Sequence, residues 1–140
     1  MVEGLSHLTF IVQNLDAMER VFVEALGATK IYDSGAESFS LSPERFYLLG
    51  PEHAPLWLVL MQGEPLPSRT YNHVAFKIPE ADLEAYRVKL KALDLGILPG
   101  RPRVAGEGQS IYFYGPDNHL FELHTGTLPQ RLSRYAEGKT

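Results

Sequence analysis

The sequence has 140 residues, no cysteine, and a formal net charge of −4 from 13 Lys and Arg against 17 Asp and Glu. This length fits one domain or two small halves. The absence of cysteine excludes disulfides, zinc fingers, iron–sulfur clusters and a thiol nucleophile, so any metal must be held by His and carboxylates. A chain without cysteine also fits a cytoplasmic location. The mild acidity argues against nucleic-acid binding, no apolar run is long enough to cross a membrane, and residues 1–4 lack the pattern of a signal peptide.

The first half begins with a strand over residues 6–12, where apolar and polar residues alternate and β-branched and aromatic residues are frequent. Asn14, Leu15 and Asp16 form a capping pattern for a helix over Ala17–Leu26, which Gly27 ends. Short strands are then expected near Lys30–Tyr32, Glu37–Leu41, Arg45–Leu49 and Leu56–Met61, with a turn at Gly50-Pro51.

The second half repeats this order. A strand over residues 72–78 matches the first one, with His73 at the place of His7. A helix begins at Pro79–Asp82, has Leu83, Tyr86, Leu90 and Leu93 on one face, and ends by Gly96. Strands follow near Gly96–Pro99, Gln109–Tyr114 and His119–His124, the last two joined by a turn at Gly115–Asn118, and Leu128–Tyr135 has helical spacing.

The repeat predicts the α+β class, with two βαβββ units at about residues 4–62 and 70–126 and a helical tail at about 127–137. We treat residues 1–140 as a single domain. Each half alone is too small to bury its sheet well, so the two mixed sheets should pair, within one chain or between two chains.

Three side chains form a candidate metal site. His7 and His73 occupy matching positions, and Glu122 lies among apolar residues in the strand Leu120–His124. A carboxylate in such a strand is costly unless it is paired or binds a metal, and two imidazoles with one carboxylate leave coordination positions open for catalysis. The alternative is two satisfied structural histidines and an exposed glutamate, but the matched positions favour the metal. Aligning the last strands of the halves puts Leu58 at the position of Glu122.

These features resemble the vicinal oxygen chelate superfamily, which includes glyoxalase I, extradiol dioxygenases and the fosfomycin-resistance enzymes. The resemblance covers nearly the whole chain. It is strongest in six stretches, namely Phe39–Ser42, Arg69–His73, Arg101–Gly108, Ser110–Tyr114, Asp117–His124 and Gly126–Leu128. In this order they are more similar to the FosX type, which adds water to the epoxide of fosfomycin, than to the types that add a thiol.

The resemblance implies a Mn(II) site formed by His7, His73 and Glu122, although the same ligands would accept other divalent first-row metals. The ion would act as a Lewis acid on the epoxide oxygen. The resemblance also implies a homodimer in which sheets are shared between chains, so His7 can come from a different subunit than His73 and Glu122.

Glu44 is implied to be the general base that deprotonates the attacking water. Without the resemblance, an exposed turn residue would be the simpler interpretation. Arg45 departs from the family pattern, and its charge would weaken the base if it lay alongside Glu44.

Substrate-binding residues are also implied by the resemblance. A phosphonate needs cations and hydroxyl donors, and Arg131 matches the arginine that binds it. Thr9 matches a residue near the oxirane, and Arg103 is a second candidate arginine. Ser110 and Tyr112 match hydroxyl donors, and Tyr71 and Trp57 would line the pocket. Core packing would explain the two aromatic residues equally well.

The sequence therefore predicts a Mn(II)-dependent fosfomycin epoxide hydrolase that gives an inactive diol. One alternative is a thiol transferase of the glutathione type acting on the same drug. Others are a metalloenzyme for another phosphonate or epoxide, and a metal-free binding protein, which the predicted ligands disfavour. Glu44 discriminates between the first two, because a thiolate needs no base.

Overall fold

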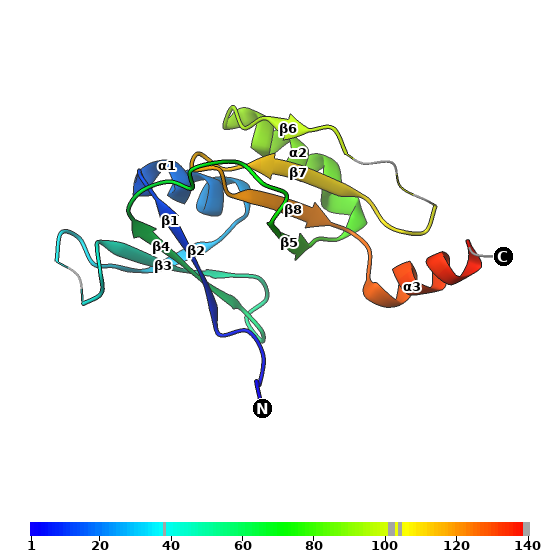
Figure 1. The fold of residues 1–140 in the computed structure, drawn as a ribbon, viewed down its shortest axis with the longest axis horizontal. Helices are drawn as coiled ribbons and strands as arrows, with labels where there is room; N and C mark the ends of the chain where they lie inside the picture. The colour runs from blue at the N-terminus through cyan, green and yellow to red at the C-terminus, as the bar shows by residue number, and fades with distance from the viewer. Residues whose placement is uncertain (38, 101–102, 104, 139–140) are drawn as a thin grey trace. The chain divides into compact units, whose positions relative to one another are not determined.

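The computed structural model describes residues 1–37, 39–100, 103 and 105–138. The chain forms two compact units (Figure 1): unit 1 is Met1–Arg69 with Gly115–His119, and unit 2 is Thr70–Tyr114 with Leu120–Thr140. Within the described part of the chain, no helix is long and apolar enough to cross a membrane.

Unit 1 contains a mixed sheet with the strand order β1-β4-β3-β2. Strand β1 (His7–Val12) runs parallel to β4 (Leu56–Gln62), and β3 (Glu44–Leu49) is antiparallel to both β4 and β2 (Thr29–Asp33). Helix α1 (Leu15–Arg20) starts after Asn14, whose side chain accepts a hydrogen bond from the Ala17 N–H, and continues as the π-helical turn η1 (Val21–Ala25). Gly27 ends this helix at a φ of +80°.

Unit 2 repeats the arrangement with the order β5-β8-β7-β6. Its elements are β5 (His73–Lys77), the 3₁₀ turn η2 (Glu80–Asp82), α2 (Leu83–Ala92), β6 (Ile97–Leu98), β7 (Ser110–Tyr114), β8 (Leu120–His124) and α3 (Leu128–Glu137). Strand β5 is parallel to β8, and β7 is antiparallel to β8 and β6. A capping box of Thr127 and Gln130 starts α3.

Each sheet has one face in a core and one face that carries polar side chains. In unit 1, Phe10 and Tyr47 make edge contacts with the ring of Phe22 on η1. Side chains of directly paired residues point to the same face of a sheet, so the register places His7, Trp57 and Glu44 on the opposite face. Unit 2 buries Phe76, Phe113 and Phe121 on its core face. The same register rule assigns its polar face to His73, Ser110, Tyr112, Glu122 and His124.

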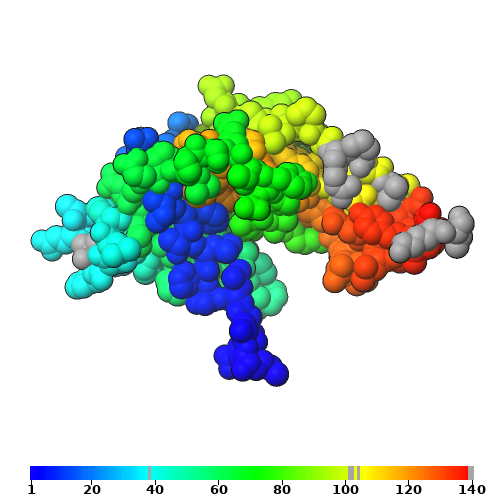
Figure 2. Space-filling model, viewed as in Figure 1, coloured from blue at the N-terminus to red at the C-terminus, as the bar shows by residue number. Residues whose placement is uncertain are grey.

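The α+β class and the repeated βαβββ order are confirmed, and each sheet has four strands. The strand expected at Glu37–Leu41 is wrong: residue 38 lies outside the described residues, Glu37 has no regular structure, and residues 39–41 form bends. Phe39 is fully exposed and Leu41 is 94% exposed, so these apolar side chains pack against no part of the chain that the structure describes. Figure 2 shows this segment, in cyan, projecting from the surface of unit 1.

Other differences are at element ends. Helix α2 ends at Ala92, before Gly96, because Asp94 adopts a left-handed φ of +57° and stops the helix without a glycine. Helix α1 begins two residues before the predicted start, directly after its cap. Arg101, Pro102 and Val104, which belong to one of the stretches that carried the resemblance, lie outside the described residues.

Candidate metal and substrate site

His73 and Glu122 form the centre of the site in unit 2, with His73 Nε2 3.0 Å from Glu122 Oε1. The other ring nitrogen of His73 lies 2.7 Å from the carbonyl oxygen of Tyr71, which can only accept, so Nδ1 carries the proton. His73 Nε2 and Glu122 Oε1 therefore lie side by side on the polar face of the sheet. When Nε2 carries no proton, these two atoms are a nitrogen–oxygen donor pair of the kind that holds a metal ion.

Glu122 is nearly buried and its second oxygen, Oε2, is surrounded by donors. Ser110 donates a hydrogen bond to Oε2, Arg103 Nη2 lies at 3.2 Å and His124 Nδ1 at 3.4 Å. Burial alone would raise the pKa of Glu122, but the Ser110 hydrogen bond and the charges of its neighbours hold this pKa below its usual value. Glu122 therefore stays ionised, as a metal ligand must.

Tyr112 places a hydroxyl beside this pair. Arg103 Nη2 and Tyr71 Oη each lie 3.0 Å from Tyr112 Oη. Burial, the hydrogen bond with Tyr71 and the charge of Glu122 raise the pKa of Tyr112 to about 12, so its hydroxyl keeps its proton. Arg103 also borders a cavity of about 500 Å³.

Arg131 of α3 joins the same cluster through its contact with His124, where Nη2 lies 3.2 Å from Nε2. The structure thus brings together, in unit 2, all the predicted site residues of that unit: His73, Glu122, Tyr71, Arg103, Ser110, Tyr112 and Arg131.

Unit 1 carries the third predicted ligand, His7, on an exposed position of β1. Its ring packs on Trp57, with ring centroids 4.3 Å apart, and its Nδ1 is 3.0 Å from Ser6 Oγ. Thr9 is also exposed and shares this face, since it pairs with Val59 as His7 pairs with Trp57. Each histidine therefore has an aromatic neighbour in its own unit, Trp57 for His7 and Tyr71 for His73.

The register also corrects the counterpart of Glu122. His73 pairs with Leu120 and His7 with Trp57, so Glu122 corresponds to Val59. Leu58, the residue aligned with Glu122 in the sequence, is completely buried on the core face. An alignment error of one residue in a strand moves a side chain to the other face.

Glu44 is the first residue of β3 and is 8% exposed, which excludes the exposed turn. Its backbone is fixed by Ser34, whose N–H donates to the Glu44 carbonyl and whose hydroxyl accepts from the Glu44 N–H. Within the described residues, no hydrogen bond to the Glu44 carboxylate is found. The backbone of Glu44 is therefore fixed, and its carboxylate is buried without a hydrogen bond from the described residues, as a general base requires.

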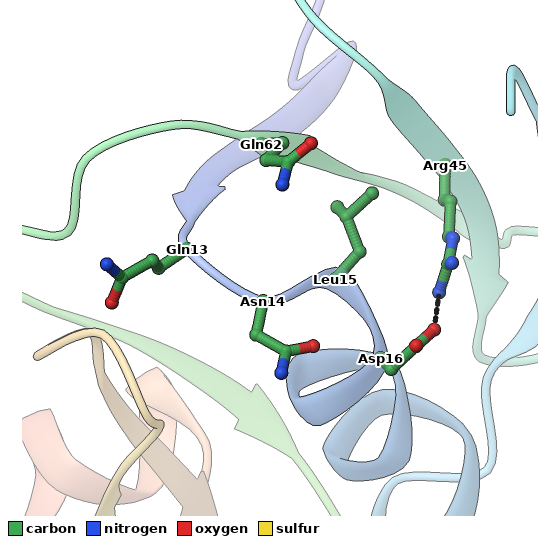
Figure 3. A pocket seen from close by; sticks show the side chains of 6 residues that line it. All are labelled: Gln13, Asn14, Leu15, Asp16, Arg45 and Gln62. Carbon is green, nitrogen blue, oxygen red and sulfur yellow. Dashed lines mark ion pairs between the residues drawn. The ribbon is translucent and has the colours of Figure 1, made fainter. Parts of the chain in front are cut away.

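Arg45 points away from Glu44, to the other face of the sheet, where it lies beside α1 and lines a cavity of about 530 Å³ (Figure 3). Its guanidinium is 2.9 Å from Asp16, 3.3 Å from Glu19 and 3.2 Å from Asp33. The charge of Arg45 is therefore balanced by three carboxylates and does not lie alongside Glu44.

Two further polar residues of unit 2 lie outside the predicted set of site residues. Glu107, 1% exposed, pairs with Arg103 at 3.3 Å and accepts a hydrogen bond from Tyr135 at 2.7 Å. His124 lies between Ser110 and Arg131. Strand alternation predicts that His124 shares the polar face with Glu122, although from sequence a structural histidine is the simpler interpretation. Across the described ranges, no group of three or more His, Asp or Glu side chains forms a metal-binding cluster.

No protein-family model matches the chain. The chain is 53% identical over 138 residues to a fosfomycin resistance protein FosX from Mesorhizobium japonicum, covering 99% of this chain and 96% of that protein. It is 50% identical to a FosX from Listeria monocytogenes, covering 98% of this chain and all of that protein. The chain belongs to the FosX family. FosB, a metallothiol transferase of Shouchella clausii, is more distant at 37% identity, covering 96% of this chain and 88% of that protein.

Solved structures place the FosX family in the predicted fold. A mutant of Listeria monocytogenes FosX, in complex with Mn(II) and 1S,2S-dihydroxypropylphosphonic acid, matches with a TM-score of 0.85 and 47% identity over 96% of this chain and 99% of that chain. A glyoxylase/bleomycin resistance protein/dioxygenase domain from Frankia matches with a TM-score of 0.72 at 18% identity, over 91% of this chain and all of that chain. The second match shows the fold alone, which is that of the vicinal oxygen chelate proteins.

Proposed function

We propose that this protein is a Mn(II)-dependent fosfomycin epoxide hydrolase, which adds water to the oxirane and gives an inactive vicinal diol. The observation that carries the proposal is the close approach of His73 Nε2 and Glu122 Oε1, set among hydroxyl and guanidinium donors. The FosX relatives support it, because the ligand of the Listeria monocytogenes structure is the diol expected when water adds to an epoxypropylphosphonate.

His7, His73 and Glu122 would hold Mn(II), and the bound ion supplies Lewis-acid stabilisation of the charge that develops on the epoxide oxygen. Glu44 takes the proton of the attacking water while the water oxygen bonds to an oxirane carbon and the C–O bond breaks. A proton then returns to the oxygen that was released, so the product is the substrate plus one water.

Phosphonate recognition is the role of the cationic and hydroxyl side chains. A guanidinium has five N–H donors, and Arg131 uses one on His124, so the others can bind phosphonate oxygens. Arg103 and Tyr112 add donors from unit 2, and Thr9 adds one from unit 1. Ser110, whose proton is donated to Glu122, would line the pocket beside them. Tyr71 and Trp57 would line the pocket.

We further propose that residues 1–140 act as a single domain in a cytoplasmic homodimer, with His7 supplied by one chain and His73 and Glu122 by its partner. Exposed apolar side chains on α3 support a partner: Leu128 is 67% exposed, Leu132 57% and Tyr135 41%. The outward faces of both sheets also carry the site residues, so a second copy would cover them.

The test is ³¹P NMR of fosfomycin incubated with the protein and Mn(II), with and without glutathione. The proposal predicts the diol signal in both samples. A product that forms only with thiol would instead assign the protein to thiol transfer. An unchanged substrate signal in both samples would exclude fosfomycin as substrate.

A further inference from the structure

We propose that His124 is a positioning residue, which links the phosphonate-binding Arg131 to the metal-ligand Glu122 through Ser110. The inference rests on the proposed function, since it takes Glu122 as a metal ligand and Arg131 as a substrate contact.

The donors along this chain of contacts can be assigned one by one. Arg131 Nη2 lies 3.2 Å from His124 Nε2, and arginine can only donate, so Nε2 is the acceptor. The imidazole is then neutral with its proton on Nδ1. His124 Nδ1 lies 2.7 Å from Ser110 Oγ and donates to it. The Ser110 hydroxyl is thereby left to donate to Glu122 Oε2, and the three hydrogen bonds run in one direction.

Two glycines leave room for the ring of His124. A Cβ on Gly126 would lie 2.8 Å from His124 Nε2, and a Cβ on Gly108 would lie 3.1 Å from His124 Cε1. Gly108 also has a φ of +93°, which side chains rarely adopt. The His124 carbonyl is fixed as well, since it accepts a hydrogen bond of 2.9 Å from the Ile78 N–H. The ring of His124 therefore occupies a narrow space on the polar face that only glycine at positions 108 and 126 leaves open.

As a consequence, the two carboxylate oxygens of Glu122 have different roles. Ser110 and Arg103 hold Oε2, so Oε1 faces His73 Nε2 and is the oxygen left for the metal. Residues that orient a metal ligand in this way contribute to metal affinity, although they never contact the metal. The other end of the ring orients Arg131, which contributes to substrate affinity.

Two substitutions separate the two ends of the ring. In H124N the side-chain amide N–H replaces Nδ1–H, so the contact with Ser110 is kept and that with Arg131 is lost. In H124Q the amide oxygen replaces Nε2, so the contact with Arg131 is kept and that with Ser110 is lost. The variants are compared by Mn(II) binding to the metal-free protein, followed by electron paramagnetic resonance of free Mn(II), and by the KM for fosfomycin at saturating Mn(II).

We expect a crossed result. H124N should raise the KM about 10-fold and change the Kd for Mn(II) by less than about 3-fold, whereas H124Q should raise the Kd about 10-fold or more and leave the KM nearly unchanged. S110A should likewise raise the Kd for Mn(II), because it also removes the hydrogen bond to Glu122 Oε2. H53N and H53Q are matched controls, because His53 lies in an exposed turn, and both quantities should stay at the wild-type values. If both variants change neither quantity, or change both equally, the inference is wrong.

A measurement on the unmodified protein covers the case in which a variant does not fold. Long-range ¹H–¹⁵N spectra of the metal-free protein distinguish the two neutral tautomers of histidine. The inference predicts a proton on Nδ1 of His124, and a proton on Nε2 would overturn it. Both this spectrum and the Mn(II) titration remain decisive if the wild-type protein makes no diol, so failure of the proposed function is seen separately.

Discussion

Replacing Arg45 by methionine tests how the network behind the sheet of unit 1 is stabilised. Methionine keeps most of the aliphatic volume and removes the charge. The Arg45 side chain is 14% exposed and contacts Asp16, Glu19 and Asp33 at 2.9–3.3 Å. Exposed pairs contribute up to about 1 kcal/mol, and losing one partner of a buried pair costs about 3–5 kcal/mol, so for this nearly buried arginine we expect a loss of about 2–3 kcal/mol.

The loss should also depend on pH. The pKa of Glu19 is lowered, because hydrogen bonds from Tyr47 and Lys30 and the charge of Arg45 outweigh the effect of burial. The pKa of Asp33 is lowered chiefly by the Gly35 N–H, with help from Arg45 that outweighs burial. Stability from such carboxylates is present above their ordinary values of 4.5 and 3.8 and is lost as the pH falls through the lowered folded values. The penalty of R45M should therefore shrink in acid.

The assay is urea unfolding at neutral and acid pH, followed by the fluorescence of Trp57, the single tryptophan, which lies in β4 of unit 1. In a thermal melt the same loss corresponds to a decrease of roughly 7–10 °C in Tm. R20M is the matched control, because Arg20 is 62% exposed and pairs only with Glu24 in the described residues, and it should cost about 0.5 kcal/mol or less. The reasoning is refuted if R45M costs no more than R20M, or if its cost is undiminished in acid.

Three further predictions concern the proposed reaction. E44Q should lower kcat by roughly 10²–10⁴-fold and leave Mn(II) binding unchanged. E52Q, at an exposed turn, is the control and should keep the wild-type kcat. Full activity of E44Q would contradict the role of Glu44 as the base. H7A and H73A should each be inactive. If the ligands come from different chains, a dimer of one H7A chain and one H73A chain has one intact site, so random mixing of the two variants should restore about a quarter of the wild-type activity. No recovery would mean that one chain supplies all three ligands. A chelator should abolish diol formation and added Mn(II) should restore it, whereas activity that survives chelation would exclude the metal.

The sequence was informative wherever a pattern is local or repeated. The matched positions of His7 and His73 predicted the two halves, and their opening strands, most later strands and the tail helix follow within about two residues of the prediction. The segment 37–41 failed because alternation alone does not make a strand: Phe39 and Leu41 have the required spacing but no surface to cover.

The side-chain network of the site was less predictable. Strand alternation separates Glu44 from Arg45, and this was within reach of sequence reasoning once β3 was placed. The contacts of Arg45 with Asp16, Glu19 and Asp33 depend on the packing of α1 and β2 against β3, which no local pattern encodes. Val59, and not Leu58, is the counterpart of Glu122 because strand register sets the correspondence, and register is fixed by strand pairing and not by sequence similarity.

The central claim is that water, activated by Glu44, is the nucleophile that opens the oxirane. Turnover of fosfomycin with Mn(II) in ¹⁸O-labelled water, without any thiol, followed by mass spectrometry of the product, tests this claim most directly. We expect a diol that carries one oxygen from the solvent. Failure to form the diol, or a diol without the solvent label, would contradict it.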